Sequence, residues 1–234
     1  MTNTLHRFSE HYAFEPKPNP APVEDDFIVF AMATRGVNDD GLVDKYRTFA
    51  RLALAHNPVN VGDATKGGIY RPQPALNPLA HWKRDDRPDP ERLIEDIEGH
   101  TVVAAVFSRW EDMEAFVEDV VQADLGLSVN ISAPIDAAAR CCKASGLTRH
   151  SLEYSLGFQG RVERLPDRAV LEISTMCGHG MVSHTFVKKM VDWVKEGRRT
   201  PAQAARYMAR FCVCGVFNTV RAEKLFEQAR TRGA

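Results

Sequence analysis

The chain has 234 residues, of which 44% are hydrophobic and 26% charged, the ordinary mixture of a globular protein. Its 30 basic and 31 acidic residues leave a net charge of −1, so the overall charge does not indicate a protein that binds nucleic acid or an anionic membrane. No apolar run approaches the ~20 residues of a membrane-spanning helix, and the polar N-terminal segment does not resemble a secretory signal.

These properties favour a cytoplasmic protein with no membrane partner, in which the five cysteines are reduced thiols. For thiols in that compartment, metal binding or catalysis is expected before disulfide formation.

Residues 1–25 form a polar, proline-rich segment, which is typical of an extended or disordered arm. The arm carries His11, Tyr12 and Phe14, so we expect that any homo-oligomer forms through it. Residues 26–234 are expected to form a single α/β domain, with a C-terminal helical segment, 181–234, that carries part of the functional site.

Apolar runs and periodic patterns divide this domain into strands and helices. A long stretch between them, 57–92, has no clear pattern and is expected to be a functional loop or a wrap over the sheet. The expected strands are 27–33, 101–107, 127–133, 150–158 and 169–175, and the expected helices are 42–56, 111–124, 134–146, 183–196, 200–210 and 218–231.

The alternation of strands and helices predicts a layered α/β domain with a mixed or mostly parallel sheet, followed by three C-terminal helices. A ferredoxin-like split arrangement remains open, because the strand order does not follow from the sequence. One helix boundary is well defined: Thr200 and Gln203 form a capping box around Pro201 at the first helical position.

Two short motifs place three cysteines near helix entrances. Cys177 lies in "MCGHG" after the expected strand 169–175, and the carboxyl ends of strands are where ligands bind in α/β sheets. Cys212 and Cys214 lie in "FCVCGVFN", where Asn218 or Thr219 is a good N-cap for the last helix. The helices 183–196 and 200–210 form an αα-hairpin, which returns the chain from Cys177 towards Cys212.

Three converging thiols, rather than four, predict a [4Fe–4S] cluster in which one iron lacks a cysteine ligand. Such an iron is a Lewis acid, as in aconitase-type dehydratases by chemical analogy. The leading hypothesis is therefore a lyase-like iron–sulfur enzyme that acts on a small anionic metabolite by elimination, hydration or removal of sulfur.

Other polar residues are candidates for the same site. His179, between two glycines, and His184 are the candidate acid/base groups. The candidate substrate-binding residues are Arg35, Asn38, Asn60 and Arg221. Arg221 stands in the first turn of the last helix, where a cation opposes the helix dipole unless it binds an anion.

Several alternatives remain open. His179 and the three cysteines are a donor set for zinc, structural or hydrolytic. A third hypothesis is a non-catalytic iron–sulfur carrier or assembly partner that docks through its arm. A fourth is an enzyme with Cys177 as a metal-free nucleophile. The cysteines could also be ordinary packing residues of the core with no chemical role. Cys141 and Cys142 point about 100° apart on a helix, so one is expected to pack in the core and the other is a potential fourth ligand.

Overall fold

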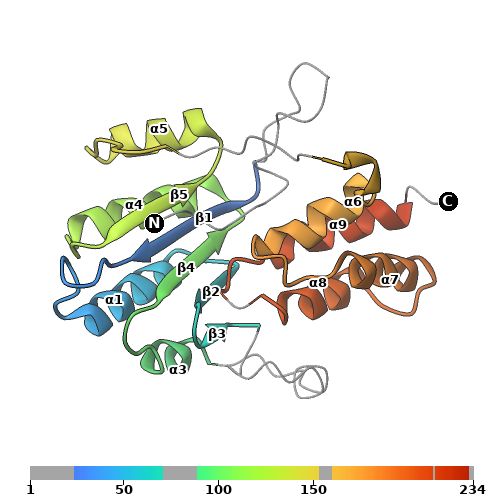
Figure 1. The fold of residues 1–234 in the computed structure, drawn as a ribbon, viewed down its shortest axis with the longest axis horizontal. Helices are drawn as coiled ribbons and strands as arrows, with labels where there is room; N and C mark the ends of the chain where they lie inside the picture. Colours follow the sequence, from blue (N-terminus) through green and yellow to red (C-terminus); the bar gives the residue numbers. More distant parts are fainter. Residues whose placement is uncertain (1–23, 71–88, 153–159, 213, 232–234) are drawn as a thin grey trace.

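The structure, a computed structural model, describes residues 24–70, 89–152, 160–212 and 214–231 (Figure 1). Its centre is a five-stranded sheet in the order β3-β2-β4-β1-β5. The strands are β1 (Phe27–Met32), β2 (Asn60–Asp63), β3 (Gly67–Gly68), β4 (Val102–Phe107) and β5 (Ser128–Ser132). The expected strands 27–33, 101–107 and 127–133 are therefore confirmed.

Every pair of neighbouring strands is antiparallel, so the expectation of a mostly parallel sheet is wrong. Two β-α-β units, β1-α1-β2 and β4-α4-β5, interleave so that β1 and β4 are central. This is the strand order of the ferredoxin-like split arrangement. The run of apolar residues in β1 is continuous because packed side chains cover both faces of this strand. Such a run is typical of parallel sheets, which are buried on both faces, but it does not require parallel pairing.

The helices follow the expected positions in most of the chain. They are α1 (Leu42–Ala55), α3 (Pro90–Glu95), α4 (Trp110–Gln122), α5 (Ile135–Ala144), α6 (Arg168–Ser174), α7 (His184–Lys195), α8 (Pro201–Ala209) and α9 (Thr219–Thr231). Figure 1 shows α6–α9, coloured orange to red, gathered as one group beside the sheet, away from α1, α4 and α5.

One expected strand is a helix. Residues 169–175 belong to α6 and to a single 3-10 turn, η4 (Thr175–Cys177). The buried residues of α6 are Val170, Leu171, Ile173 and Ser174, which is helical spacing, and β-branched residues at three positions of 169–175 concealed it.

Two other segments need separate comment. The stretch 57–92 contains the short hairpin of β2 and β3 and the helix α3, and residues 71–88 within it lie outside the described residues. Of the expected strand 150–158, residues 150–152 are not in a strand and the remainder is not described.

The two faces of the sheet carry two separate apolar clusters. On one face Val29, Ala31 and Phe107 pack with α1 and α4. On the other face Ile28, Phe30 and Val106 pack with α6–α9. The alternation of neighbouring residues between the two clusters is the period of a strand. None of the described helices is long and apolar enough to cross a membrane.

The C-terminal helices begin at well-formed caps. Thr200 accepts a hydrogen bond from the amide of Gln203, and the Gln203 side chain accepts one from the amide of Thr200, so the expected capping box is confirmed. Asn218 caps α9, because its Oδ1 accepts from the amide of Arg221 at 2.9 Å. These caps fix where α8 and α9 begin, and the cysteine pair lies between them.

Candidate metal centre

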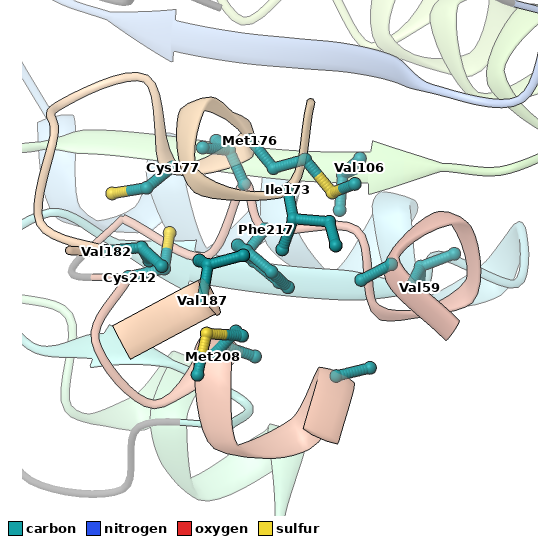
Figure 2. Packing of buried hydrophobic residues seen from close by; sticks show 14 of the residues in the cluster. Val59, Val106, Ile173, Met176, Cys177, Val182, Val187, Met208, Cys212 and Phe217 are labelled. Atoms are coloured by element: carbon teal, nitrogen blue, oxygen red, sulfur yellow. The ribbon is translucent and has the colours of Figure 1, made fainter. Parts of the chain in front are cut away.

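Three thiols meet inside the C-terminal cluster. Cys177, Cys212 and Cys214 are each no more than 3% exposed. The pKa of each thiol depends on its neighbours, and Cys212 is the partner of both Cys177 and Cys214. Figure 2 shows Cys177 and Cys212 at one end of the cluster, next to Val182. Residues 35 positions apart in the chain are thus in direct contact, as the αα-hairpin of α7 and α8 predicts.

Cys177 reaches this centre from a helix end. It is the last residue of η4, which continues α6, so the expectation that it follows a strand is wrong. A helix C-terminus carries partial negative charge, which opposes a thiolate. The chain then turns at Gly178, with φ of 67°, and the amide of His179 donates to the backbone carbonyl of Cys177 at 2.7 Å.

Cys214 and Gly215 lie directly on the hairpin of β2 and β3. A Cβ atom on Gly62 would stand 2.8 Å from the carbonyl carbon of Cys214, and one on Gly215 would stand 2.6 Å from the amide nitrogen of Gly62. Contacts this short leave no room for a side chain at either position. The glycines therefore allow the backbone of the cysteine segment to pack directly on the backbone of the sheet.

Asn60 connects the same two segments. Its side chain is 1% exposed, donates to the carbonyl of Phe217 at 3.3 Å and accepts from the amide of Ile69 at 3.2 Å. We expected Asn60 in substrate binding, but in the structure both of its polar atoms serve to position the segment that carries the cysteines. The glycines of the "VGD" and "KGG" sequences were the visible signal for this close backbone contact. The sequence alone suggested only that they belong to ordinary turns.

The three sulfurs differ in acidity. The pKa of Cys212 is lowered well below its usual value, first by the hydrogen bond from the thiol of Cys177 and then by the one from Cys214. The amides of Cys214 and Val216 add further hydrogen bonds to this sulfur. The pKa values of Cys177 and Cys214 are raised, because each hydrogen-bonds to Cys212 through its own proton and because burial disfavours a thiolate. Cys212 is thus the most acidic thiol of the group.

His179 lies at the surface beside the buried sulfurs. It is exposed, and its Nδ1 stands 3.5 Å from the sulfur of Cys214. His184, the first residue of α7, is also exposed, and no contact joins it to the thiols. Of the two expected acid/base groups, His179 is the one that the structure brings to the centre.

The other expected substrate-binding residues do not converge here. Arg221 forms an ion pair with Asp25 at 2.5 Å, which also binds Lys224 at 3.0 Å. Asn38 accepts from the amide of Thr34 and donates to the carbonyl of Gly126, in the turn after β1. Arg35 is exposed in that same turn.

The remaining two cysteines are outside the centre. Cys141 is fully buried in the cluster of the opposite sheet face, and Cys142 is half-buried. Cys142 lines a cavity of about 1410 Å³ next to β5 and α5. The described lining of this cavity includes none of Cys177, Cys212 and Cys214. Neither Cys141 nor Cys142 is therefore a fourth ligand in this arrangement.

Within the described residues, no group of three or more His, Cys, Asp or Glu side chains is placed so that it holds a metal ion as it stands. Metal ligation requires deprotonated sulfurs directed at one point, whereas the pKa values of Cys177 and Cys214 are raised. Ligation by these cysteines therefore requires the loss of their protons and rotation of their side chains.

No known protein family, curated protein or solved structure matches the chain.

Proposed function

We propose that Cys177, Cys212 and Cys214 bind a metal centre through three thiolates, with His179 at the fourth position. The observation that carries the proposal is the contact of three buried sulfurs from two segments of the chain. Packing alone does not require an imidazole nitrogen 3.5 Å from one of these sulfurs, and thiolates together with an imidazole are a donor set for zinc. The proposal assumes a reducing compartment such as the cytoplasm.

The spacing of the donor atoms favours a single zinc ion. In a tetrahedral zinc site, with bonds of about 2.3 Å to sulfur and 2.0 Å to nitrogen, neighbouring S and N ligands stand about 3.5 Å apart. The sulfur of Cys214 and Nδ1 of His179 are 3.5 Å apart.

His179 gives this centre its chemistry. The three cysteines are buried, but the imidazole is exposed and reaches solvent. With three thiolates and one exchangeable ligand, a bound metal supplies a Lewis acid. If His179 leaves the fourth position, its imidazole remains close enough to bind or release a proton beside the centre. The centre is therefore suited to hydrolytic chemistry as well as to a structural role.

The second candidate is a [4Fe–4S] cluster in a lyase-like enzyme. It is favoured by the number of thiols, three. The imidazole of His179 beside the sulfur of Cys214 is a ligand that suits zinc better. Arg221, the cation expected to bind the anionic substrate, is paired with Asp25. Both points place the cluster second. A carrier that passes such a cluster to another protein would use the same three ligands.

Metal and sulfide analysis after anaerobic purification tests the proposal. We expect about one zinc per chain and no acid-labile sulfide in the wild type. Replacement of Cys177, Cys212 or Cys214 by alanine should abolish binding. The matched control is Cys141→Ala, since Cys141 is equally buried but lies on the other face of the sheet.

The possible results of the metal and sulfide analysis distinguish the hypotheses. Iron with an equal amount of sulfide, lost in the same three variants, would establish the cluster and reject zinc. Wild-type protein without metal, even after reconstitution with zinc or with iron and sulfide, would reject the proposal. Selective alkylation of one thiol in that metal-free protein would then favour a cysteine nucleophile.

A further inference from the structure

The αα-hairpin of α7 and α8 carries a basic surface that the thiol centre does not use. We call it the basic hairpin patch and define it by four cations and two aromatic residues: Lys189, Trp193, Arg198, Arg199, Tyr207 and Arg210. Lys189, Arg198 and Arg199 stand over the Trp193 ring, and Arg199 and Arg210 over the Tyr207 ring. The six side chains form one continuous group.

The charge of this hairpin is opposite to that of the rest of the chain. Residues 184–210 contain seven basic and two acidic residues, and the remainder contains 23 basic and 29 acidic residues. A net charge of −1 therefore hides a strong internal separation of charge. Opposite charge on a partner would be attracted to the hairpin and repelled elsewhere, which fixes the orientation of docking.

The cations are positioned before any partner binds. The guanidinium carbon of Arg198 is 4.9 Å from the centre of the Trp193 ring, and that of Arg210 is 4.9 Å from the centre of the Tyr207 ring. Stacking restricts long side chains that would otherwise lose entropy on binding. Glu196 forms an ion pair with Arg198 at 3.2 Å.

Two buried donors of the patch have no acceptor within the described structure: Nε1 of Trp193 and Nε of Arg199. A buried N–H group without a partner is unfavourable, because it has lost its hydrogen bond to water. The Arg199 guanidinium lies 5.6 Å from the Trp193 ring centre, so both donors belong to one locality. An acceptor group that reorients the covering arginine side chains would satisfy both.

We propose that the basic hairpin patch is the docking surface for an acidic protein, whose carboxylates bind its arginines. A carboxylate accepts from a guanidinium in two parallel hydrogen bonds, which the stacked arginines present ready for contact. A nucleic acid fits less well, because bases stack on open aromatic faces and both rings here are covered by cations. A long polyanion would also extend over the acidic remainder of the chain.

The patch ends beside the thiol centre. Arg210 is two residues before Cys212, and Phe211 between them packs edge-on against Phe186 of α7, with ring centres 5.4 Å apart. A protein docked on the patch therefore comes close to the surface above the sulfurs. The docking surface does not depend on which metal the centre binds, so it can be tested separately.

A fluorescent peptide of about ten glutamates serves as the probe. A fluorescent single-stranded oligonucleotide of matching charge is measured beside it, to represent nucleic acid. Binding to the full-length protein is measured by fluorescence anisotropy at about 50 mM salt, where surface charges are weakly screened. The test variant is Lys189→Glu/Arg198→Glu. Its control is Arg161→Glu/Arg164→Glu, which changes the net charge equally at exposed positions outside the hairpin.

We expect the peptide to bind the wild type and the control with similar affinity, and to bind the test variant at least tenfold more weakly. The size of this effect is taken from close charge pairs at interfaces, which contribute roughly 1.5 kcal/mol or more. Metal content and unfolding temperature should remain those of the wild type in both variants. Equal weakening in the two variants would overturn the proposal, because attraction would then depend on net charge alone. Tighter binding of the oligonucleotide than of the peptide would overturn it too, in favour of a nucleic-acid surface.

Discussion

The two faces of the sheet are both covered by buried apolar residues, but the two clusters differ in what else they contain. The face against α1 and α4 is an apolar core with aromatic contacts: the ring of Phe116 lies 5.0 Å from that of Phe49 and 5.3 Å from that of Phe107. The face against α6–α9 contains methionines, direct backbone contacts between glycines and three adjoining thiols. Equal burial therefore does not mean equal function.

The contrast between two buried cysteines makes this concrete. Burial raises the pKa of Cys141, on the α1/α4 face, to about 11, and no hydrogen bond from another cysteine offsets it. The pKa of Cys212, on the other face, is lowered, because two thiols and two backbone amides donate hydrogen bonds to its sulfur. Burial of a cysteine is common, so the difference between these two lies in their neighbours: the pKa of Cys212 depends on two other buried thiols, and that of Cys141 does not.

The largest expected effect tests whether the two faces are independent. Phe116→Ala and Phe217→Ala each remove a fully buried ring, one from each cluster, and should lower the free energy of unfolding by about 3–5 kcal/mol. Only Phe217→Ala should also weaken metal binding, because Phe217 belongs to the segment of Cys212 and Cys214. Urea unfolding and metal titration measure the two quantities. Equal loss of metal in both variants would mean that the faces are not independent.

A second effect tests the backbone contact beneath the cysteine pair. Gly215→Ala introduces a Cβ at 2.6 Å from the amide nitrogen of Gly62, in a residue whose φ is +73°. We expect a loss of about 2–4 kcal/mol in unfolding free energy, together with weaker metal binding.

Gly99→Ala is the matched control for that variant. Gly99 has a similar φ, +65°, but nothing lies within 4 Å of its added Cβ. Only the cost of the left-handed backbone, about 1 kcal/mol, should remain. If Gly99→Ala were as destabilising as Gly215→Ala, the close packing of the cysteine segment on β2 would not be the reason.

The smallest effect concerns Asp25, which ties the segment before β1 to α9. Burial alone would raise the pKa of Asp25, but Arg221 and Lys224 lower it below its ordinary value. Its contribution to stability is therefore complete above the unfolded-state pKa, about 4, and is lost as the pH falls through the lower pKa of the folded state. We expect Asp25→Asn to reduce stability by about 1 kcal/mol at pH 7 and by less in acid.

The comparison variant for Asp25 is Asp40→Asn, at an exposed carboxylate in the turn before α1. It should leave the unfolding free energy within about 0.5 kcal/mol of the wild type at either pH. A pH dependence shared by the two variants would assign the acid loss to general charge rather than to the Asp25 ion pairs.

Much of the fold follows from local patterns in the sequence. The amphipathic period of α1, α4 and α7 and the capping box of α8 are properties of neighbouring residues, and all four helices lie within two residues of their expected bounds. Strand direction and order depend on distant pairings, which no local pattern encodes, so the sequence left the ferredoxin-like order open without selecting it. In α6 the β-branched residues outweighed the helical spacing of its buried positions.

The candidate site divides in the same way. The glycines around the cysteines and the hairpin between them led to the three thiols and to His179. The partners of Arg221 and Asn60 were not predictable, since Asp25 and Phe217 are distant in the sequence from these residues. These two polar residues hold distant parts of the chain together, whereas the cysteines in the two similar local motifs lie in one cluster.

X-ray absorption spectroscopy at the metal edge is the most direct test of three-thiolate ligation. For the zinc-loaded protein we predict three sulfur neighbours at about 2.3 Å and one nitrogen neighbour at about 2.0–2.1 Å. The nitrogen should be lost in His179→Ala while the three sulfurs remain. A first shell of oxygen and nitrogen alone, or an unchanged spectrum in Cys212→Ala, would contradict the assignment of Cys177, Cys212 and Cys214 as the metal ligands.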